Sequence, residues 1–372
     1  MAAGPSSGLQ LELDASGSGM DINFSGPLSE QPSFSLSQSG TFVKEDFVIN
    51  KSGIAAVNGT PVPQLGVRLG DLEMLEILGK GASSLVRKAL HRPSSTMLAV
   101  KILNVFDKGK RDQLLRELRT LYSNPLPWIV GFHDCLYDEG AMYIVLEYMD
   151  GGSLADVLQI VRDTGSGGLS ELVLGKLTRH VLEGLNHLHH ERHQVHRDMK
   201  PGNILLNSSG EVKISDFGLS AEFTETIAEN GAESGVNLLR TTCGTSNYIA
   251  PEVLADAGYD GFLADIWSCG ILLFVMLAGY LPFDDKTTAR LFKKIMEEEV
   301  SYPKSFSAGA RALLAGILQK KPEARLTLAQ ILADDWCQSK VVDDFSHVAN
   351  AFELFNATNP YLSSAPSSAP SQ

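Results

Sequence analysis

Short runs of apolar and β-branched residues characterise the part of the chain that precedes Gly151. Four of these runs alternate or are continuously apolar, are bounded by Gly, Pro or Ser, and predict β-strands over residues 73–78, 85–89, 97–103 and 142–147. Between the third and fourth runs, leucines recur at helical spacing at 114, 118 and 121 and predict one helix. We therefore expect a small β-rich part at this end of the fold.

After Gly151 the apolar positions recur with a helical period. One stripe, placed behind Ser170 as the predicted N-cap, consists of Leu174, Leu177, Val181, Leu185 and Leu188. The apolar stretch 266–281 contains small and polar residues and ends before Pro282, so it predicts a buried core helix; a membrane span needs roughly 18–20 consecutive apolar residues. A larger α-rich part is expected here, with a ligand bound between the two parts.

The two ends of the chain differ in composition from its middle. Residues 1–38 are rich in Ser and Gly and are predicted to be disordered, and residues 39–70 are expected to form an extension that lies extended against the folded domain. The domain itself is expected over 71–337, with its β-rich lobe at about 71–147 and its helical lobe at about 151–337. Residues 338–372 are expected to be a C-terminal extension with a low-complexity tail.

The charge balance limits the partners that the chain can bind. Lys plus Arg number 31 and Asp plus Glu number 44, so the net charge is −13, which argues against binding of nucleic acid through bulk electrostatics. The four cysteines are scattered, which favours reduced thiols in the cytoplasm or nucleus. No Lys or Arg precedes Lys44, which argues against a secretory signal or an Arg-rich transit peptide.

Two local patterns suggest phosphate binding. The turn between the first two predicted strands carries Gly79 and Gly81, whose backbone N–H groups could approach phosphate oxygens closely; an ordinary hairpin turn would have the same sequence. Lys101 ends a strand among apolar neighbours, and Glu117 lies on the apolar face of the predicted helix. The two charges can pair and direct the lysine at phosphates, or both can extend to solvent.

The strongest signal is a set of three motifs: His196-Arg197-Asp198-Met199-Lys200-Pro201-Gly202-Asn203, then Asp216-Phe217-Gly218, then Ala250-Pro251-Glu252. With them the chain resembles the eukaryotic protein kinases over about residues 72–336. The resemblance implies the bilobal α+β protein kinase fold, with a small β-rich N-lobe and a larger α-helical C-lobe. It also implies ATP and Mg²⁺ as cofactors and protein hydroxyls as phosphoryl acceptors.

Phosphoryl transfer spreads negative charge over the γ-phosphate, so the site needs metal ligands, a cation and a proton acceptor. Asn203 and Asp216 carry oxygen ligands that suit Mg²⁺. Asp198 is expected to orient the substrate hydroxyl and accept its proton, and Lys200 to neutralise the moving phosphoryl group. Asp265, which opens the buried helix, is expected to pair with the backbone of this loop.

The kinase resemblance implies further residues around the nucleotide. Lys101, held by Glu117, would contact the α- and β-phosphates. The full predicted ATP site consists of Leu78, Gly79, Gly81, Val86, Ala99, Lys101, Glu147, Met149 and Leu205. Arg325 is expected to pair with Glu252, as in the kinases that this chain resembles.

Two kinase subfamilies are similar to different halves of the chain. Residues 39–217 resemble the MAP kinase kinases of plants and algae, on Ser39-Gly40-Thr41-Phe42 and on the run from Tyr148 to Asp156. From Lys213 onward the sequence resembles the calcium/calmodulin-dependent and AMP-activated group, and within it the plant calcineurin-B-like-interacting kinases. In that group Thr241 would be the activating threonine, phosphorylated by an upstream kinase and paired with Arg197.

Two other features have simpler interpretations. The histidines at 187, 189, 190 and 193 are expected to be a solvated helix end rather than a metal site. Asn350-Ala351-Phe352 is similar to the calcium-sensor-binding motif of the plant kinases but is expected to be a short amphipathic helix, so calcium-sensor binding is not expected. The sequence thus predicts a serine/threonine protein kinase, with a dual-specificity MAP kinase kinase and a pseudokinase scaffold as alternatives.

Overall fold

The computed structural model describes residues 35–36, 41–44, 47–56, 66–81, 84–105, 108–122, 126–163, 169, 171–222, 239, 244–255 and 258–339. These residues divide into two compact units. The first unit holds the described residues up to Asp112 together with Gly131–Tyr148, and the second holds Gln113–Val130 and the described residues from Met149 onward. The first is built mainly from strands and the second mainly from helices, which confirms the predicted α+β class.

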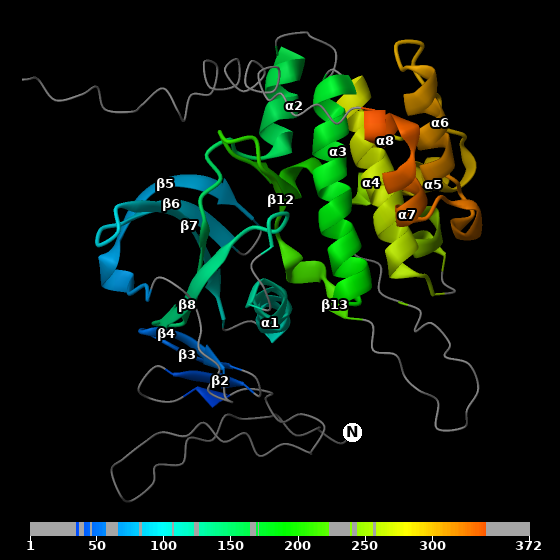
Figure 1. The fold of residues 1–372 in the computed structure, drawn as a ribbon. Coiled ribbons are helices and arrows are strands. Elements are labelled where there is room, and N and C mark those ends of the chain that lie inside the picture. Colours follow the sequence, from blue (N-terminus) through cyan, green and yellow to red (C-terminus); the bar gives the residue numbers. More distant parts are fainter. Residues whose placement is uncertain are drawn as a thin grey trace, which may run out of the picture. The chain divides into compact units, whose positions relative to one another are not determined.

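A five-stranded antiparallel sheet forms the centre of the first unit (Figure 1). Its strand order is β5-β6-β7-β9-β8, with bounds β5 (Leu72–Lys80), β6 (Ser84–His91), β7 (Thr96–Asn104), β8 (Phe132–Asp138) and β9 (Ala141–Glu147). The buried residues of its core are Val67, Leu72, Ala89, Leu98, Val100, Leu136 and Val145. Four of these strands match the predicted runs, but β8 was not predicted because His133 and Asp134 interrupt its apolar pattern.

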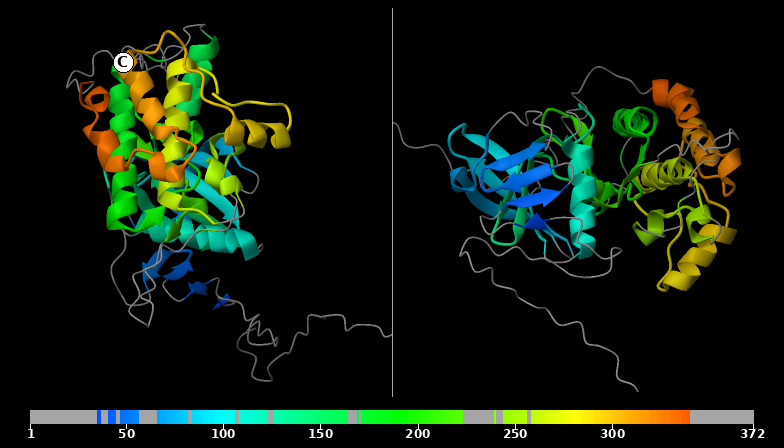
Figure 2. Two further views of the ribbon diagram at one scale, coloured as in Figure 1. Left: turned by 90° about the vertical axis from the view of Figure 1, so that its right-hand side faces the viewer. Right: turned by 90° about the horizontal axis from the view of Figure 1, so that it is seen from below.

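The N-terminal extension adds a second antiparallel sheet, the accessory sheet, to the same unit. It consists of β1 (Ser35–Leu36), β2 (Phe42–Lys44), β3 (Phe47–Asn50) and β4 (Gly53–Ala56) in sequence order. Strands β3 and β4 contact β8, the edge strand of the larger sheet, and in Figure 2 the accessory strands lie in blue beside that sheet. Strands β2 to β4 belong to the predicted extension, which therefore forms paired strands and is more regular than the extended chain that the sequence predicts. Strand β1 lies in the stretch 1–38, so the prediction of disorder was wrong for residues 35–36.

Asp134 is the polar anchor between the accessory sheet and β8. Its Oδ1 accepts hydrogen bonds from the backbone N–H of Ile54 at 3.1 Å and of Cys135 at 2.8 Å. Gly53 has φ of +124°, and a Cβ at this position would lie 2.9 Å from the same oxygen. Only glycine therefore lets the β3–β4 turn approach the carboxylate so closely.

The second unit contains the remaining helices around a buried one. They are α2 (Leu154–Asp163), α3 (Glu171–Asn186), α4 (Gly261–Ala278), α5 (Thr288–Glu297), α6 (Ala308–Ile317), α7 (Leu328–Ala333) and α8 (Asp335–Ser339). Helix α1 (Lys108–Tyr122), which was predicted, spans the division between the units. Helices α3 and α6 both contact α4, and Figure 2 shows the three side by side.

Helix α4 is the predicted core helix. By length and composition it could cross a membrane, but 78% of it is buried within the fold. The Asp260 side chain accepts the N–H of Phe262 at its start, and Gly279 ends it with φ of +78°. Cys269 on this helix, like Cys135 and Cys337, is a buried free thiol, in agreement with the prediction of reduced cysteines for these three.

We expect Asp134→Ala to loosen the accessory sheet, because each buried N–H that loses its acceptor costs about 1–3 kcal/mol. Burial raises the pKa of Asp134 to about 6, although its backbone hydrogen bonds act to lower it. The folded state therefore binds the proton more tightly, and the carboxyl contributes most below about pH 4 and progressively less as the pH rises through 6.

Hydrogen exchange of the Ile54 amide measures this effect. The difference in protection between the wild type and Asp134→Ala should narrow from pH 4 to pH 8. The exposed carboxylate of Glu73, which contacts Arg92, provides the control Glu73→Ala, for which no such narrowing is expected. A difference for Asp134→Ala that widens with rising pH would contradict the assignment.

Candidate active site

The loop between β10 (Gln194–Val195) and the 3-10 turn Pro201–Asn203 carries the first predicted motif, and a carboxylate on α4 holds its backbone. Asp265 Oδ2 accepts the N–H of His196 and Oδ1 accepts the N–H of Arg197, each at 2.7 Å. Arg197 has φ of +67°, a conformation that costs on the order of 1–3 kcal/mol for a residue other than glycine. The two charge-assisted hydrogen bonds offset this strain and confirm the predicted partner of Asp265.

Asp265 is buried, and its environment keeps it ionised. Burial alone would raise its pKa, but His189 and the backbone N–H of His196 lower it below its ordinary value. His189 Nε2 donates to Asp265 Oδ2 at 3.0 Å. The carboxylate thus accepts three hydrogen bonds from one stretch of chain, residues 189–197, and fixes that stretch against α4.

The histidine run behaves differently from the prediction of a solvated helix end. His187 and His189 are buried, at 8% and 5% exposure, whereas His190 and His193 are more accessible to solvent. At the end of α3 the chain makes one π-helical turn, His187–Glu191, and this wider turn brings His189 to Asp265. The prediction was therefore wrong for His187 and His189, because a contact 76 residues away along the chain buries one of them.

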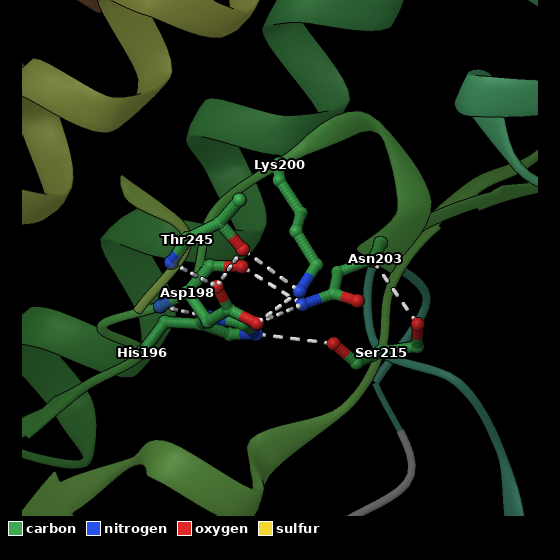
Figure 3. A network of polar contacts seen from close by, with 6 residues as sticks. All are labelled: His196, Asp198, Lys200, Asn203, Ser215 and Thr245. Atoms are coloured by element: carbon green, nitrogen blue, oxygen red, sulfur yellow. Dashed lines mark hydrogen bonds and ion pairs between the residues drawn. The ribbon is translucent and has the colours of Figure 1, made fainter. Parts of the chain in front are cut away.

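Asp198 is the centre of the polar network drawn in Figure 3. Its Oδ2 contacts Lys200 Nζ at 2.5 Å and accepts a hydrogen bond from Asn203 Nδ2 at 3.1 Å. Its Oδ1 accepts from the backbone N–H and the hydroxyl of Thr245, at 3.0 and 2.8 Å. The structure therefore brings three predicted residues together, Asp198, Lys200 and Asn203.

Thr245 completes this network from the segment that precedes Ala250-Pro251-Glu252. Its hydroxyl proton goes to Asp198, so its oxygen is an acceptor for Lys200 Nζ at 3.0 Å. One hydroxyl thus fixes both the carboxylate and the ammonium group. The resemblance to the serine/threonine kinases pairs Lys200 with Thr245, and the structure shows that contact. The bonds from Thr245 to Asp198 were not predicted, since they depend on the tertiary fold.

His196 and Ser215 connect this loop to the second predicted motif. His196 Nδ1 accepts the N–H of Asp198 at 3.2 Å, so Nε2 carries the ring proton and donates to the carbonyl of Ser215 at 3.1 Å. Ser215 in turn donates its N–H and its hydroxyl to the carbonyl of Asn203, at 2.9 and 3.1 Å. Asp216 follows directly with left-handed backbone angles, φ 64° and ψ 75°. These bonds fix the backbone on both sides of the predicted metal ligands.

The donor set fits a hard divalent cation. Both hydrogen bonds from Asn203 to Asp198 use Nδ2, one to the backbone carbonyl and one to the carboxylate, so Asn203 Oδ1 keeps its lone pairs for a metal. A carboxamide oxygen and a carboxylate such as that of Asp216 are the ligand types that Mg²⁺ takes in small number, together with phosphates and water.

The predicted nucleotide-site residues lie partly in each unit. In the first unit, Lys101 on β7 pairs in register with Val86, and Ala99 pairs with Leu146. At the turn between β5 and β6 the N–H of Gly81 donates to the carbonyl of Ser84 at 2.8 Å. The same unit contains Leu78 and Gly79 on β5 and Glu147 on β9; Glu117, Met149 and Leu205 belong to the second unit. The roles of these residues in binding a nucleotide remain predictions.

Two further expectations concern the segment after Asp216. Thr241 lies outside the described residues. The predicted pair of Glu252 and Arg325 is confirmed as a two-pronged contact, with guanidinium to carboxylate distances of 2.8 and 3.1 Å. Arg325 also donates to the carbonyl of Leu263 on α4. The Ala250-Pro251-Glu252 motif is thereby tied to the helix that carries Asp265.

We expect Asp265→Asn to cost about 3–5 kcal/mol, because a buried charge partner and one hydrogen-bond acceptor are lost. Since the pKa of Asp265 is lowered in the folded state, the carboxylate stabilises the protein above about pH 4, and this contribution disappears at more acidic pH. The measurement is urea denaturation followed by tryptophan fluorescence, because Trp267 lies on α4.

Asp285→Asn is the control, since Asp285 is a carboxylate outside the loop network, bonded to the N–H of Thr287 and contacting Lys294. It should lower the urea midpoint less than Asp265→Asn does. Equal midpoints for Asp265→Asn and the wild type at pH 7 would show that the buried carboxylate does not hold the loop.

Comparisons with known proteins agree with this geometry. Residues 72–337 match the family model described as protein kinase domain. The chain is 42% identical over 272 residues to CBL-interacting protein kinase 9 of Oryza sativa subsp. japonica, covering 72% of this chain and 57% of the relative. It is 40% identical over 272 residues to CBL-interacting serine/threonine-protein kinase 8 of Arabidopsis thaliana, covering 72% and 58%.

A third relative, CBL-interacting protein kinase 3 of Oryza sativa subsp. japonica, is 40% identical over 296 residues, covering 76% of this chain and 64% of the relative. The chain thus spans less than two thirds of the length of these relatives. They correspond to the second of the two predicted resemblances and do not support the likeness of residues 39–217 to MAP kinase kinases. With a family match over more than half of its length and the Asp198 network in place, the chain belongs to the protein kinase domain family.

Proposed function

We propose that this chain is an ATP- and Mg²⁺-dependent serine/threonine protein kinase. The observation that supports it most is the network in which Thr245, Lys200 and Asn203 hold the Asp198 carboxylate. The names of the rice and Arabidopsis relatives both describe a protein kinase, and that of the Arabidopsis relative specifies a serine/threonine-protein kinase. We also propose that it acts in the cytoplasm or nucleus, which fits the free thiols of Cys135, Cys269 and Cys337 in the described part of the chain.

In this proposal Asp198 orients the acceptor hydroxyl and takes its proton as the new O–P bond forms and the bond to the leaving ADP breaks. Lys200 lies against Asp198 and would neutralise negative charge on the transferred group. Asn203 and Asp216 would hold Mg²⁺, and Lys101, positioned by Glu117, would contact the α- and β-phosphates. When bound, the metal and nucleotide supply the phosphoryl group and part of the charge neutralisation.

We expect that this kinase does not require an arginine before the acceptor residue of its substrates. Positions at which arginine-directed kinases carry acidic residues hold Ser153, Gly202 and Val275 in this sequence. Ser153 instead begins α2, donating its N–H and its hydroxyl to Asp156 at 2.8 and 2.6 Å. The nearest carboxylate on that helix is thereby engaged in capping.

A peptide library should therefore show no enrichment of arginine before the acceptor residue.

One finer point concerns a protein partner. The relatives' names state that they interact with CBL, which weighs against the prediction that this chain binds no calcium sensor. Asn350-Ala351-Phe352, the sequence similar to such a motif, lies outside the described residues. Binding of the full chain to a CBL protein with and without Ca²⁺ tests this point directly.

One prediction of this proposal concerns the catalytic residue Asp198. Asp198→Asn should abolish phosphate incorporation into a generic protein substrate, since the proton acceptor is lost, while binding of Mg·ATP stays close to that of the wild type. Labelled phosphate transfer and equilibrium nucleotide binding are the two measurements. A wild-type chain that binds nucleotide but transfers no phosphate would favour the pseudokinase alternative. Tyrosine phosphorylation of an inactive MAP kinase would favour the dual-specificity alternative.

The second prediction concerns Thr245. Thr245→Val keeps the shape but removes the hydroxyl between Asp198 and Lys200, so kcat for a peptide substrate should fall by roughly 10- to 100-fold, because a misplaced catalytic group can cost up to about 100-fold in rate. Thr245→Ser keeps the hydroxyl and should retain most of the activity. Equal activities of the valine and serine variants would show that the hydroxyl has no role.

A further inference from the structure

A short backbone bridge lies beside the Asp198 network. The N–H of Leu239 donates to the carbonyl of Tyr259 at 3.0 Å, and the N–H of Tyr259 donates to the carbonyl of Leu239 at 2.9 Å. Tyr259 is buried and precedes the capping residue of α4, Asp260. Two hydrogen bonds in antiparallel geometry therefore fix Leu239 at the start of the helix that carries Asp265.

The side chain of Leu239 occupies space that a glycine leaves open. A Cβ at Gly261, the first residue of α4, would lie 2.8 Å from Leu239 Cδ1 and 3.0 Å from Val195 Cγ1. Leu239 and Val195 thus approach the same point of the helix from two different segments. Val195 is fully buried and directly precedes His196, whose N–H is held by Asp265.

The bridge and the catalytic network border one cavity, whose lining includes Asp198, Thr245, Tyr259 and Asp265. At Gly244, φ is +103° and a Cβ would lie 2.6 Å from the carbonyl oxygen of Arg197. The chain is therefore fixed at Leu239, against α4, and again at Gly244 and Thr245, against the catalytic loop.

We infer that Leu239 is a positioning residue for the catalytic loop: packed on Gly261 beside Val195, it holds the segment that leads from Val195 into His196 in its place against α4. The inference rests on the proposed kinase activity and adds to it a specific packing contact. The apolar side chain of Leu239 can make no hydrogen bond, so its effect would come from shape alone. A displacement of about 1 Å at such a site can cost up to 100-fold in rate.

The test is a double-mutant cycle between Gly261→Ala and Leu239→Ala. In the chain with Leu239, Gly261→Ala should raise KM for a peptide and lower kcat/KM about 10-fold, with ATP affinity unchanged within about twofold. In the Leu239→Ala background the contact with Leu239 Cδ1 is gone and the tightest remaining contact is that with Val195 Cγ1 at 3.0 Å, so the same substitution should lower kcat/KM less, by about threefold at most. Leu239→Met, of similar volume, should stay close to the wild type.

Gly309→Ala is the matched control. Gly309 also lies near the start of a helix, α6, and a Cβ there would approach Trp336 Cδ1 at 3.2 Å, away from the bridge. Its kcat/KM should equal that of the wild type. Hydrogen exchange of the Tyr259 amide gives a readout without catalysis, and it should be faster in Gly261→Ala than in the wild type or in Gly309→Ala.

The inference would be overturned if Gly261→Ala lowered kcat/KM by the same factor in the chain with Leu239 and in the Leu239→Ala background. It would also be overturned if the Gly261→Ala variant had normal kcat/KM and normal hydrogen exchange of the Tyr259 amide. A wild-type chain that transfers no phosphate would overturn the proposed function instead, and the exchange of Tyr259 would then decide the packing contact by itself. Should Gly261→Ala fail to fold, a normal peptide KM in Leu239→Ala would contradict the inference.

Discussion

The buried carboxylate of Asp265 is the interaction on which the rest of the site depends. It accepts hydrogen bonds from the backbone of His196 and Arg197 and from the ring of His189. An ionised carboxylate in this position is stable only while these partners are present, and the strained backbone at Arg197 is stable only while the carboxylate is present. The hydrogen bonds between them offset both the burial of the charge and the backbone strain, and they hold the loop against α4.

Helix α4 therefore acts as the platform of the second unit. Its first residue receives Leu239, its next turn holds the catalytic loop through Asp265, and the carbonyl of Leu263 accepts from Arg325. Arg325 in turn holds Glu252, close to the segment that supplies Thr245. Leu239, the catalytic loop and the segment around Glu252 are thus all held by one helix, which is the kind of support that fixes reacting groups to within a fraction of an ångström.

The sequence predicts local features of this protein well. Strands with a clear alternation, the apolar helix α4 and the motif residues Asp198, Lys200 and Asn203 depend on neighbours within a few positions, so their pattern is visible along the chain. The partner of Asp265 could be predicted too, because a carboxylate in an apolar helix requires one.

Other features depend on distant contacts and could not be predicted. The apolar pattern of strand β8 is interrupted by Asp134, whose carboxylate accepts a hydrogen bond from Ile54 of the accessory sheet. The strands of that sheet are short and lie outside the residues that match the family model. His189 is polar and lies among other histidines, and only the fold shows that it is buried against Asp265. The role of Gly261 likewise becomes visible only when Leu239 is placed beside it.

The most direct test of this account is amide hydrogen exchange at His196 and Arg197 in the free protein, without nucleotide. If Asp265 holds the loop in advance of any ligand, both amides should exchange as slowly as the core amides of α4, and Asp265→Asn should make them exchange at least about 100-fold faster, as expected for the loss of a charge-assisted bond of roughly 3 kcal/mol. Rapid exchange of both amides in the wild type would contradict a loop that is fixed by the buried carboxylate.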